Sequence, residues 1–246
     1  PPNAPQLLLS LAQDPAPAVR RCALEALADH VPQMDLSTLQ QALAANLGHP
    51  DRPVRQCAAR LASLLPEPAW RALWAQQAKA PAPSRLTATL ALLDRNPANT
   101  LQADALDAAL SAVATSQDRS QQLEAIRLAI RALGDYRVEN PTLEVYAPYE
   151  PALSLQGHQP LVARIQHTIR KIFPTPDPDV NREAARLLAF VQDDARSTPE
   201  AMLGLITAQS PPADDFHYLA VLARLTGPLP SNAIPPLAHA ILSLDR

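Results

Sequence analysis

Histidines are the first residues of this chain to examine for chemistry, because an imidazole can bind a metal or move a proton near neutral pH. None stands in a His-x-x-x-His or Cys-x-x-Cys spacing, the arrangements that bring two ligands to one metal. The sequence therefore predicts no dedicated metal site. The six histidines are His30, His49, His158, His167, His217 and His239.

One histidine has polar neighbours in the sequence. His217 and Tyr218 follow Asp214 and Asp215, and a nearby carboxylate can orient an imidazole for proton transfer. The same aspartates suit the first turn of a helix, where the helix dipole favours negative charge. We favour this second interpretation and keep His217 and Tyr218 as candidates for an interaction surface.

A second polar group is Asn181-Arg182-Glu183, at the start of a predicted helix. These side chains could form an interaction surface. Glu183 and Arg186 are also three residues apart, so they share one helical face and can form a weak ion pair. We favour a solvated helix turn and retain Asn181, Arg182 and Glu183 as candidates.

Motifs of nucleophilic and nucleotide chemistry do not occur in the sequence. A Gly-x-Ser-x-Gly elbow, a phosphate-binding loop and a dinucleotide fingerprint all need glycines, and the chain has five. The formal net charge of −3 gives no general attraction to nucleic acid or an anionic membrane. Apolar runs stay well short of the ~18 residues of a membrane span. We predict a protein that is not an enzyme, with no nucleic-acid partner and no membrane insertion.

Tyrosines gather in a stretch where the helical spacing fails, residues 134–160. Tyr136, Tyr146 and Tyr149 lie there among several prolines, and so long a connection is often functional. Tyrosine offers apolar area and a hydroxyl, which suits docking of a partner. Alternatively, the rings fasten the insertion to the flank of the domain. Both interpretations remain open.

The elements that position these residues are predicted to be helices. Hydrophobic residues make up 47% of the chain but aromatic residues only 4%, so the core must consist of small and aliphatic side chains. The 27 prolines fall mostly between apolar-periodic stretches, where they begin or end helices. Helices are predicted over about 18–30, 35–47, 84–94, 99–114, 118–133, 161–173, 199–208, 214–225 and 232–244.

A short phrase recurs along the chain. The segment from Val19 to Ala23 returns 35 residues later from Val54 to Ala58, and a third copy begins at Val180. Such a period is typical of stacked helical repeats. We therefore predict an all-α superhelix of the solenoid type, with about six helix pairs, in one domain over residues 1–246.

Cysteine and tryptophan are interpreted within this repeat. Cys22 and Cys57 occupy equivalent repeat positions, and we expect both thiols in the core. Equivalent positions on stacked helices lie ~8–10 Å apart, too far for a disulfide. Trp70 and Trp74 share one helical face. They could stack on a ligand, but we favour a role in covering the local core.

The repeated phrase Asp-x-x-Val-Arg-x-x-Ala, seen from Asp51 to Ala58, resembles the HEAT-repeat family. The resemblance implies an α-solenoid in which the arginine pairs with nearby acidic groups, forming a ladder along the stack. Arg20 and Arg55 match the ladder position. Asn181 departs from it, which would interrupt a continuous ladder there.

The second half carries a further resemblance, over about residues 123–244. Ile172-Phe173-Pro174, the segment from Asp179 to Glu183 and the segment from Phe216 to Ala220 resemble the HEAT-like part of large multidomain proteins typical of planctomycetes. Those proteins combine a sugar-dehydrogenase-like propeller with a c-type cytochrome domain. The resemblance implies an exported parent protein with haem c elsewhere, since neither Cys22 nor Cys57 begins a Cys-x-x-Cys-His motif.

The predicted function is that of a non-catalytic scaffold or interdomain spacer. Its partners would be neighbouring domains of the same chain or another protein, and this segment would bind no cofactor of its own. The chain begins without Met, so we expect it to be part of a longer polypeptide. Alternatives are a free-standing adaptor and a HEAT-like enzyme of the lyase or DNA glycosylase type. The resemblance implies that the protein is periplasmic or otherwise exported, and without it we expect a cytoplasmic protein.

Overall fold

A computed structural model describes residues 4–96, 100–135 and 147–243. Regular structure in these ranges is helical throughout, with thirteen α-helices and three short 3-10 helices, which confirms the all-α prediction. The chain divides into two compact units. Unit 1 comprises residues 1–98 and 104–109, and unit 2 comprises residues 99–103 and 110–246. The division falls within helix α7 (Ala103–Thr115).

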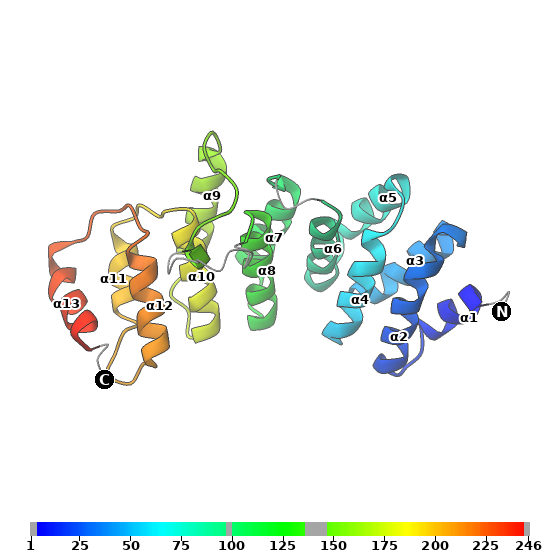
Figure 1. Ribbon diagram of the computed structural model, residues 1–246, viewed down its shortest axis with the longest axis horizontal. Coiled ribbons are helices and arrows are strands. Elements are labelled where there is room, and N and C mark those ends of the chain that lie inside the picture. Colours follow the sequence, from blue (N-terminus) through cyan, green and yellow to red (C-terminus); the bar gives the residue numbers. More distant parts are fainter. Residues whose placement is uncertain (1–3, 97–99, 136–146, 244–246) are drawn as a thin grey trace. The chain divides into compact units, whose positions relative to one another are not determined.

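Unit 1 contains two rows of packed helices. Helices α2, α4 and α6 lie side by side in one row, α1 packs on α2, and α3 and α5 form a second row against α4 and α6 (Figure 1). The bounds are α1 (Ala4–Leu11), α2 (Pro17–Leu27), η1 (Ala28–Gln33), α3 (Leu36–Leu47), α4 (Arg52–Ser63), α5 (Glu67–Gln77) and α6 (Ala82–Arg95).

The core of unit 1 is aliphatic, as its composition predicts. Leu24, Leu27 and Val31 are buried, and so are Val54 and the other repeat positions that face α2 and α6. Their spacing of three and four residues places them on one helical face. Trp70 is 4% exposed, stacks on Trp74 and lies beneath the Arg95 guanidinium. The two tryptophans therefore cover the local core.

The cysteines do not fit the predicted core positions. Cys22 is exposed and Cys57 is half-buried, and both are free thiols. The Cys57 thiol donates a hydrogen bond to Glu25 Oε1 at 3.3 Å. The buried positions of this face are filled by Ala23 and Ala58, whose small side chains let α2 and α4 approach. The expectation of core thiols is wrong for Cys22 and only half met for Cys57.

Aspartates begin several helices. Asp35, Asp51, Asp118 and Asp177 each accept a hydrogen bond from the backbone N–H three residues later, at 2.8–3.0 Å. These caps satisfy amide groups that have no partner within the helix. Proline in the first turn supports the starts of α2 and α4, and also of three helices of unit 2, α9 (Gln159–Arg170), α10 (Pro178–Phe190) and α12 (Pro212–Leu222).

In the first two repeats, the arginine at the ladder position closes the turn that precedes its helix. Arg20 donates to the carbonyl of Asp14 at 2.5 Å, and Arg55 donates to the carbonyl of His49 at 3.1 Å. Each carbonyl lies six residues before the arginine. Arg20 also reaches Asn46 Oδ1 at 3.1 Å. Contrary to the ladder implied by the resemblance, Arg20 binds carbonyl and amide oxygens rather than a carboxylate.

Unit 2 repeats the layered packing. Helices α8, α10 and α12 lie in a row, α9 packs on α10, and α11 packs on α12 and α13 (Figure 1). The bounds are α8 (Arg119–Ala132), η2 (Ala147–Tyr149), α9 (Gln159–Arg170), α10 (Pro178–Phe190), α11 (Ser197–Leu203), α12 (Pro212–Leu222), η3 (Ser231–Ala233) and α13 (Ile234–Leu242). In the ranges described for the whole chain, no helix combines the length and apolar character needed to cross a membrane.

The stretch predicted as an insertion is described at residues 134–135 and 147–158, and α9 then begins at Gln159. The 3-10 turn η2 packs on α10. Backbone amides of Ala152 and Leu153 donate to the carbonyls of Gly134 (2.6 Å) and Leu133 (3.3 Å). This part of the stretch is therefore fastened to unit 2. Tyr136 and Tyr146 lie outside the described residues.

Candidate interaction surfaces

Predicted candidates from two distant parts of the sequence meet in unit 2. Tyr149 of η2 and His217 of α12 both line a pocket of about 260 Å³. Arg182, Glu183 and Arg186 of α10, together with Pro148, complete its lining, and we call it the tyrosine–histidine pocket. Tyr218 packs edge-on against His217 and is itself buried.

His217 uses both ring nitrogens within this pocket. Nε2 lies 3.0 Å from the carbonyl oxygen of Arg182, which can only accept, so Nε2 carries the hydrogen. Nδ1 lies 3.1 Å from the Tyr149 hydroxyl and accepts a hydrogen bond from it in the neutral ring. The imidazole is therefore oriented by a tyrosine and a backbone carbonyl. The neighbouring carboxylate considered in the sequence does not hold it.

Burial dominates the electrostatics of the pocket. It lowers the pKa of His217 below its ordinary value, against the opposing influence of the Arg182 carbonyl and of the carboxylates of Glu183 and Asp214. Burial also raises the pKa of Tyr149, and it raises that of Tyr218 to about 12. Both hydroxyls therefore stay protonated near neutral pH, and His217 favours its neutral form.

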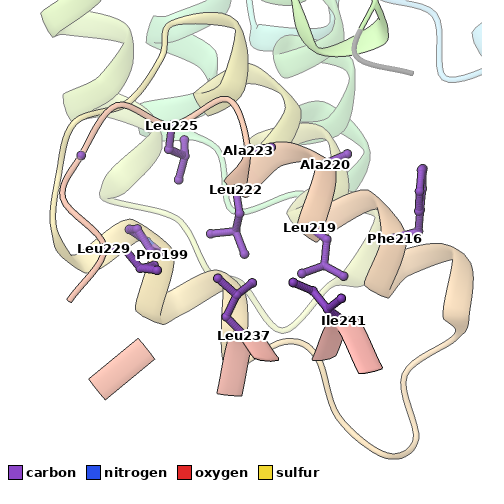
Figure 2. Close-up of a pocket in the computed structure, with 11 residues that line it drawn as sticks. Pro199, Phe216, Leu219, Ala220, Leu222, Ala223, Leu225, Leu229, Leu237 and Ile241 are labelled. Atoms are coloured by element: carbon purple, nitrogen blue, oxygen red, sulfur yellow. The ribbon is translucent and has the colours of Figure 1, made fainter. Parts of the chain in front are cut away.

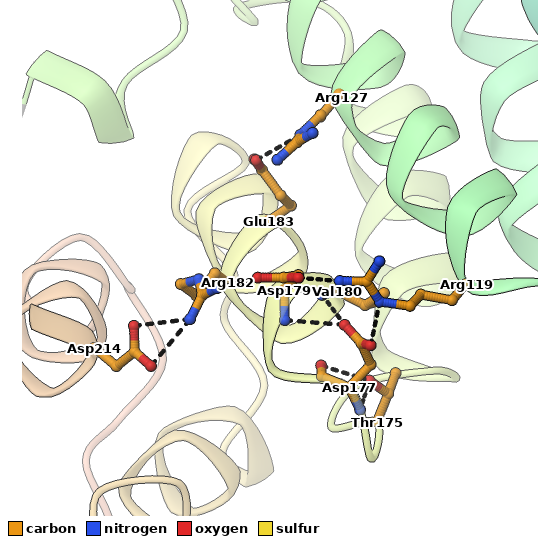
Figure 3. A network of polar contacts seen from close by, with 9 residues as sticks. All are labelled: Arg119, Arg127, Thr175, Asp177, Asp179, Val180, Arg182, Glu183 and Asp214. Atoms are coloured by element: carbon orange, nitrogen blue, oxygen red, sulfur yellow. Dashed lines mark hydrogen bonds and ion pairs between the residues drawn. The ribbon is translucent and has the colours of Figure 1, made fainter. Parts of the chain in front are cut away.

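An ion-pair network crosses the row of helices beside the pocket (Figure 3). Arg119 of α8 contacts Asp177 and Asp179, which precede and begin α10. Arg182 then joins Asp179 to Asp214 on α12, with distances of 2.9 and 3.0 Å to the two Asp214 oxygens. A ladder along α8, α10 and α12 thus exists, carried by Arg182 one residue after Asn181.

Glu183 is also an inter-helix contact. Arg127 of α8 donates to Glu183 Oε1 at 2.8 Å (Figure 3). Arg186 lies 3.9 Å from the other Glu183 oxygen. The Glu183 side chain is 17% exposed. The interpretation of residues 181–183 as a solvated helix turn is therefore wrong, because α8 and α12 pack on either side of α10 and bring opposite charges to it.

Asn181 is not part of any surface, since it is 3% exposed. Its amide donates to the carbonyl of Thr175 at 2.8 Å, and its oxygen accepts the Thr175 backbone N–H at 2.7 Å. Thr175 precedes Asn181 by six residues, the same interval as in the two arginine repeats. Although it replaces the arginine of the other two repeats, Asn181 also closes the turn before its helix.

The aspartates before His217 have partners of their own. Asp214 lies in the first turn of α12 and pairs with Arg182, while Asp215 is 5% exposed and accepts a hydrogen bond from Ser210 at 2.5 Å. Neither side chain caps the helix through a backbone N–H. Their acidic position agrees with the helix dipole. Asp214 makes a long-range contact with α10, whereas Asp215 binds the turn before its own helix.

A second surface of unit 2 is an apolar groove of about 480 Å³ between α12 and α13. Leu219 and Leu222 of α12 point toward Leu237 and Ile241 of α13 (Figure 2). Phe216 at the edge is 50% exposed and Ile241 is 53% exposed. We call this the terminal groove. Its remaining lining residues are Pro199, Ala220, Ala223, Leu225, Gly227 and Leu229.

Sequence reasoning did not find the terminal groove, although a signal was present. Phe216, Leu219 and Ala223 recur at intervals of three and four, and so do Leu237 and Ile241, which marks one apolar face on each helix. Which of these faces is covered depends on packing, and that information is not local. The pairing of Tyr149 with His217 likewise spans 68 residues.

Comparison with known proteins gives no functional relative. No protein-family model matches the chain, and no curated protein matches it. Among solved structures, one crystal structure of an engineered protein has 18% identity and a TM-score of 0.41, covering 99% of this chain and 97% of the other. A second engineered protein has 17% identity and a TM-score of 0.37, covering 96% and 86%. Both TM-scores are too low to establish a shared fold.

Proposed function

We propose that this chain is a non-catalytic helical scaffold that docks a neighbouring domain of its own polypeptide against the terminal groove. The observation that carries the proposal is the exposed apolar surface of α12 and α13. Exposed apolar patches of this kind mark sites of protein contact. The ion-paired state of Arg182 and Glu183 agrees with a structural rather than catalytic role for the polar residues of α10.

The expected occupant is the apolar face of a helix. Helix α13 carries apolar residues around most of its circumference, including the exposed Ile234, Ile241 and Leu242. A helix of that composition is normally covered on more than one side. Each of the two helical walls of the groove offers an apolar stripe, and a third helix can seat its side chains between them.

The parent protein implied by the resemblance supplies such a neighbour. In that setting the chain is a spacer within an exported protein that joins a dehydrogenase-like domain to a c-type cytochrome domain. Haem would be bound by the other domain. The spacer would contribute spacing and contact surface to that assembly.

Site-directed photo-crosslinking in the full-length natural protein tests this proposal. A photoreactive phenylalanine analogue replaces Phe216 in one variant and Ile241 in another, with exposed Leu7 of unit 1 as the matched control position. We expect crosslinks from 216 and 241 to another segment of the same polypeptide. Crosslinks to a different protein would support a free-standing adaptor instead. Absence of any crosslink specific to 216 and 241 would overturn docking at the groove.

A further inference from the structure

Residues 147–153 form a strap that packs on α10 and contacts α12 through Tyr149 and His217. Arg186 of α10 donates to the carbonyl of Pro148 at 2.6 Å, and Arg224, which follows α12, pairs with Glu150 at 3.0 Å. The two backbone bonds of Ala152 and Leu153 to residues 134 and 133 hold its far end. Between these anchors, Tyr149 turns inward and is 8% exposed.

The inward contact of the strap depends on the protonation state of one histidine. Neutral His217 accepts the Tyr149 hydroxyl hydrogen at Nδ1 while Nε2–H donates to the Arg182 carbonyl. In the imidazolium form Nδ1–H is a donor. It then faces a hydroxyl that can accept only after its own hydrogen turns away to another partner. Protonation therefore removes the Tyr149-to-His217 bond as it stands.

Charged groups surround His217 on every packed element. Arg182, Glu183 and Arg186 face it from α10, Asp214 and Tyr218 flank it on α12, and Tyr149 faces it from the strap. Their carboxylates favour the imidazolium, while the Arg182 guanidinium and burial oppose it. Burial is the largest of these influences, so its pKa lies below that of a free histidine and the neutral ring prevails at neutral pH.

We propose that the strap is an acid-released cover, held over α10 and α12 by neutral His217 and loosened when His217 gains a proton. Its release frees Arg186 from Pro148 and separates Tyr149 from His217. The trigger for this release is acidification, which protonates His217, rather than the binding of a ligand.

Hydrogen exchange of the strap amides tests the proposal. Protection of the peptide containing Ala152 and Leu153, corrected for intrinsic exchange, is compared at about pH 8 and about pH 5. We expect a loss of protection in acid, because proton binding by His217 favours the released strap. His217→Asn keeps a neutral acceptor for Tyr149 and cannot charge, so its strap should lose no protection. His167→Asn, at an exposed position of α9, is the matched control and should behave like the natural chain.

A second measurement keeps the proposal testable if His217→Asn does not fold. The imidazole of His217 is titrated by NMR in the unaltered chain, and its midpoint is compared with that of strap protection. The two midpoints should coincide. Strap protection that is constant while His217 titrates, or an acid loss that persists in His217→Asn, would overturn the proposal. Tyr149→Phe should show low protection at both pH values, because the bond is absent in each.

Discussion

Asn181 and Thr175 bond each other twice across the turn that precedes α10. The Asn181 amide donates to the Thr175 carbonyl at 2.8 Å and its oxygen accepts the Thr175 N–H at 2.7 Å. Both groups come from a side chain that is 3% exposed. The turn thus depends on one asparagine to satisfy two backbone groups that the helix cannot reach.

Replacement of this asparagine should destabilise unit 2. Asn181→Ala leaves the half-buried carbonyl and N–H of Thr175 without their partner, a loss of about 1–2 kcal/mol in the free energy of unfolding. Asn232→Ala is the matched control, since Asn232 is exposed and its side chain bonds only to Glu200 among the contacts described. It should change the free energy by less than about 0.5 kcal/mol. Urea unfolding followed by circular dichroism measures both, and equal effects would contradict the assigned role.

The Arg182–Asp214 pair should stabilise the packing of α10 on α12 modestly. The two side chains are 36% and 17% exposed, so solvent screens part of their attraction. A double-mutant cycle with Arg182→Gln and Asp214→Asn should give a coupling of roughly 0.5–1 kcal/mol that shrinks in high salt. The exposed Arg71–Glu67 pair is the comparison, and its coupling should be smaller. A salt-independent coupling would argue against an electrostatic contact.

Acid should weaken unit 2 through His217. Its folded pKa lies below the unfolded value, so the unfolded chain binds the proton more readily. The stabilisation is therefore fully present above about pH 6.5. It is lost as the pH falls from there through the folded pKa. Asp35, whose pKa is lowered to about 2, acts only in stronger acid. Urea unfolding from about pH 8 to pH 5 should show this loss in the natural chain and a flat profile in His217→Asn.

The two thiols should react at different rates. Burial and the carboxylate of Glu25 raise the pKa of Cys57 to about 11, while Cys22 is exposed. Because the thiolate is the nucleophile, iodoacetamide at neutral pH should modify Cys22 well before Cys57. Glu25→Gln removes the carboxylate that accepts the Cys57 hydrogen and should speed its modification. Peptide mass spectrometry reports both rates, and equal rates would contradict the difference in environment.

Apolar residues of the terminal groove should contribute little to folding. Phe216 is 50% exposed, so Phe216→Ser should change the free energy of unfolding by less than about 1 kcal/mol. Replacement of the buried Phe190 by Ala should lower the free energy of unfolding by about 3–5 kcal/mol. Binding of the dye ANS to the folded chain should decrease in Phe216→Ser. Leu64→Ser, at an exposed position of unit 1, should leave dye binding unchanged.

Much of the helical architecture could be predicted from the sequence because its signals are local. The spacing of Leu24, Leu27 and Val31 fixes a buried face, and Asp51 and Asp177 mark helix starts by capping a nearby amide. The same locality explains the failures. Cys22 stands beside the small core residue Ala23, but which of the two positions is buried depends on how α2 packs on α4.

The candidate surfaces were only partly predictable for the same reason. Residue type alone marks His217 and Tyr149 as candidates, yet their pairing joins segments that are 68 residues apart in the sequence. Arg182 and Glu183 carried charges that any solvated turn would also carry. Their partners on α8 and α12 are 56 and 32 residues away, a distance over which residue spacing holds no information.

In each of the three turns before α2, α4 and α10, the fourth residue of the following helix bonds a carbonyl six residues before it, so the turn and the helix form one structural unit. A fragment that starts at Pro178, the first residue of α10, would lack Thr175, and the Asn181 side chain would lose both of its backbone partners. A truncation or graft of this chain should therefore begin before Asp14, His49 or Thr175, so that the turn and the helix that closes it stay in the same fragment.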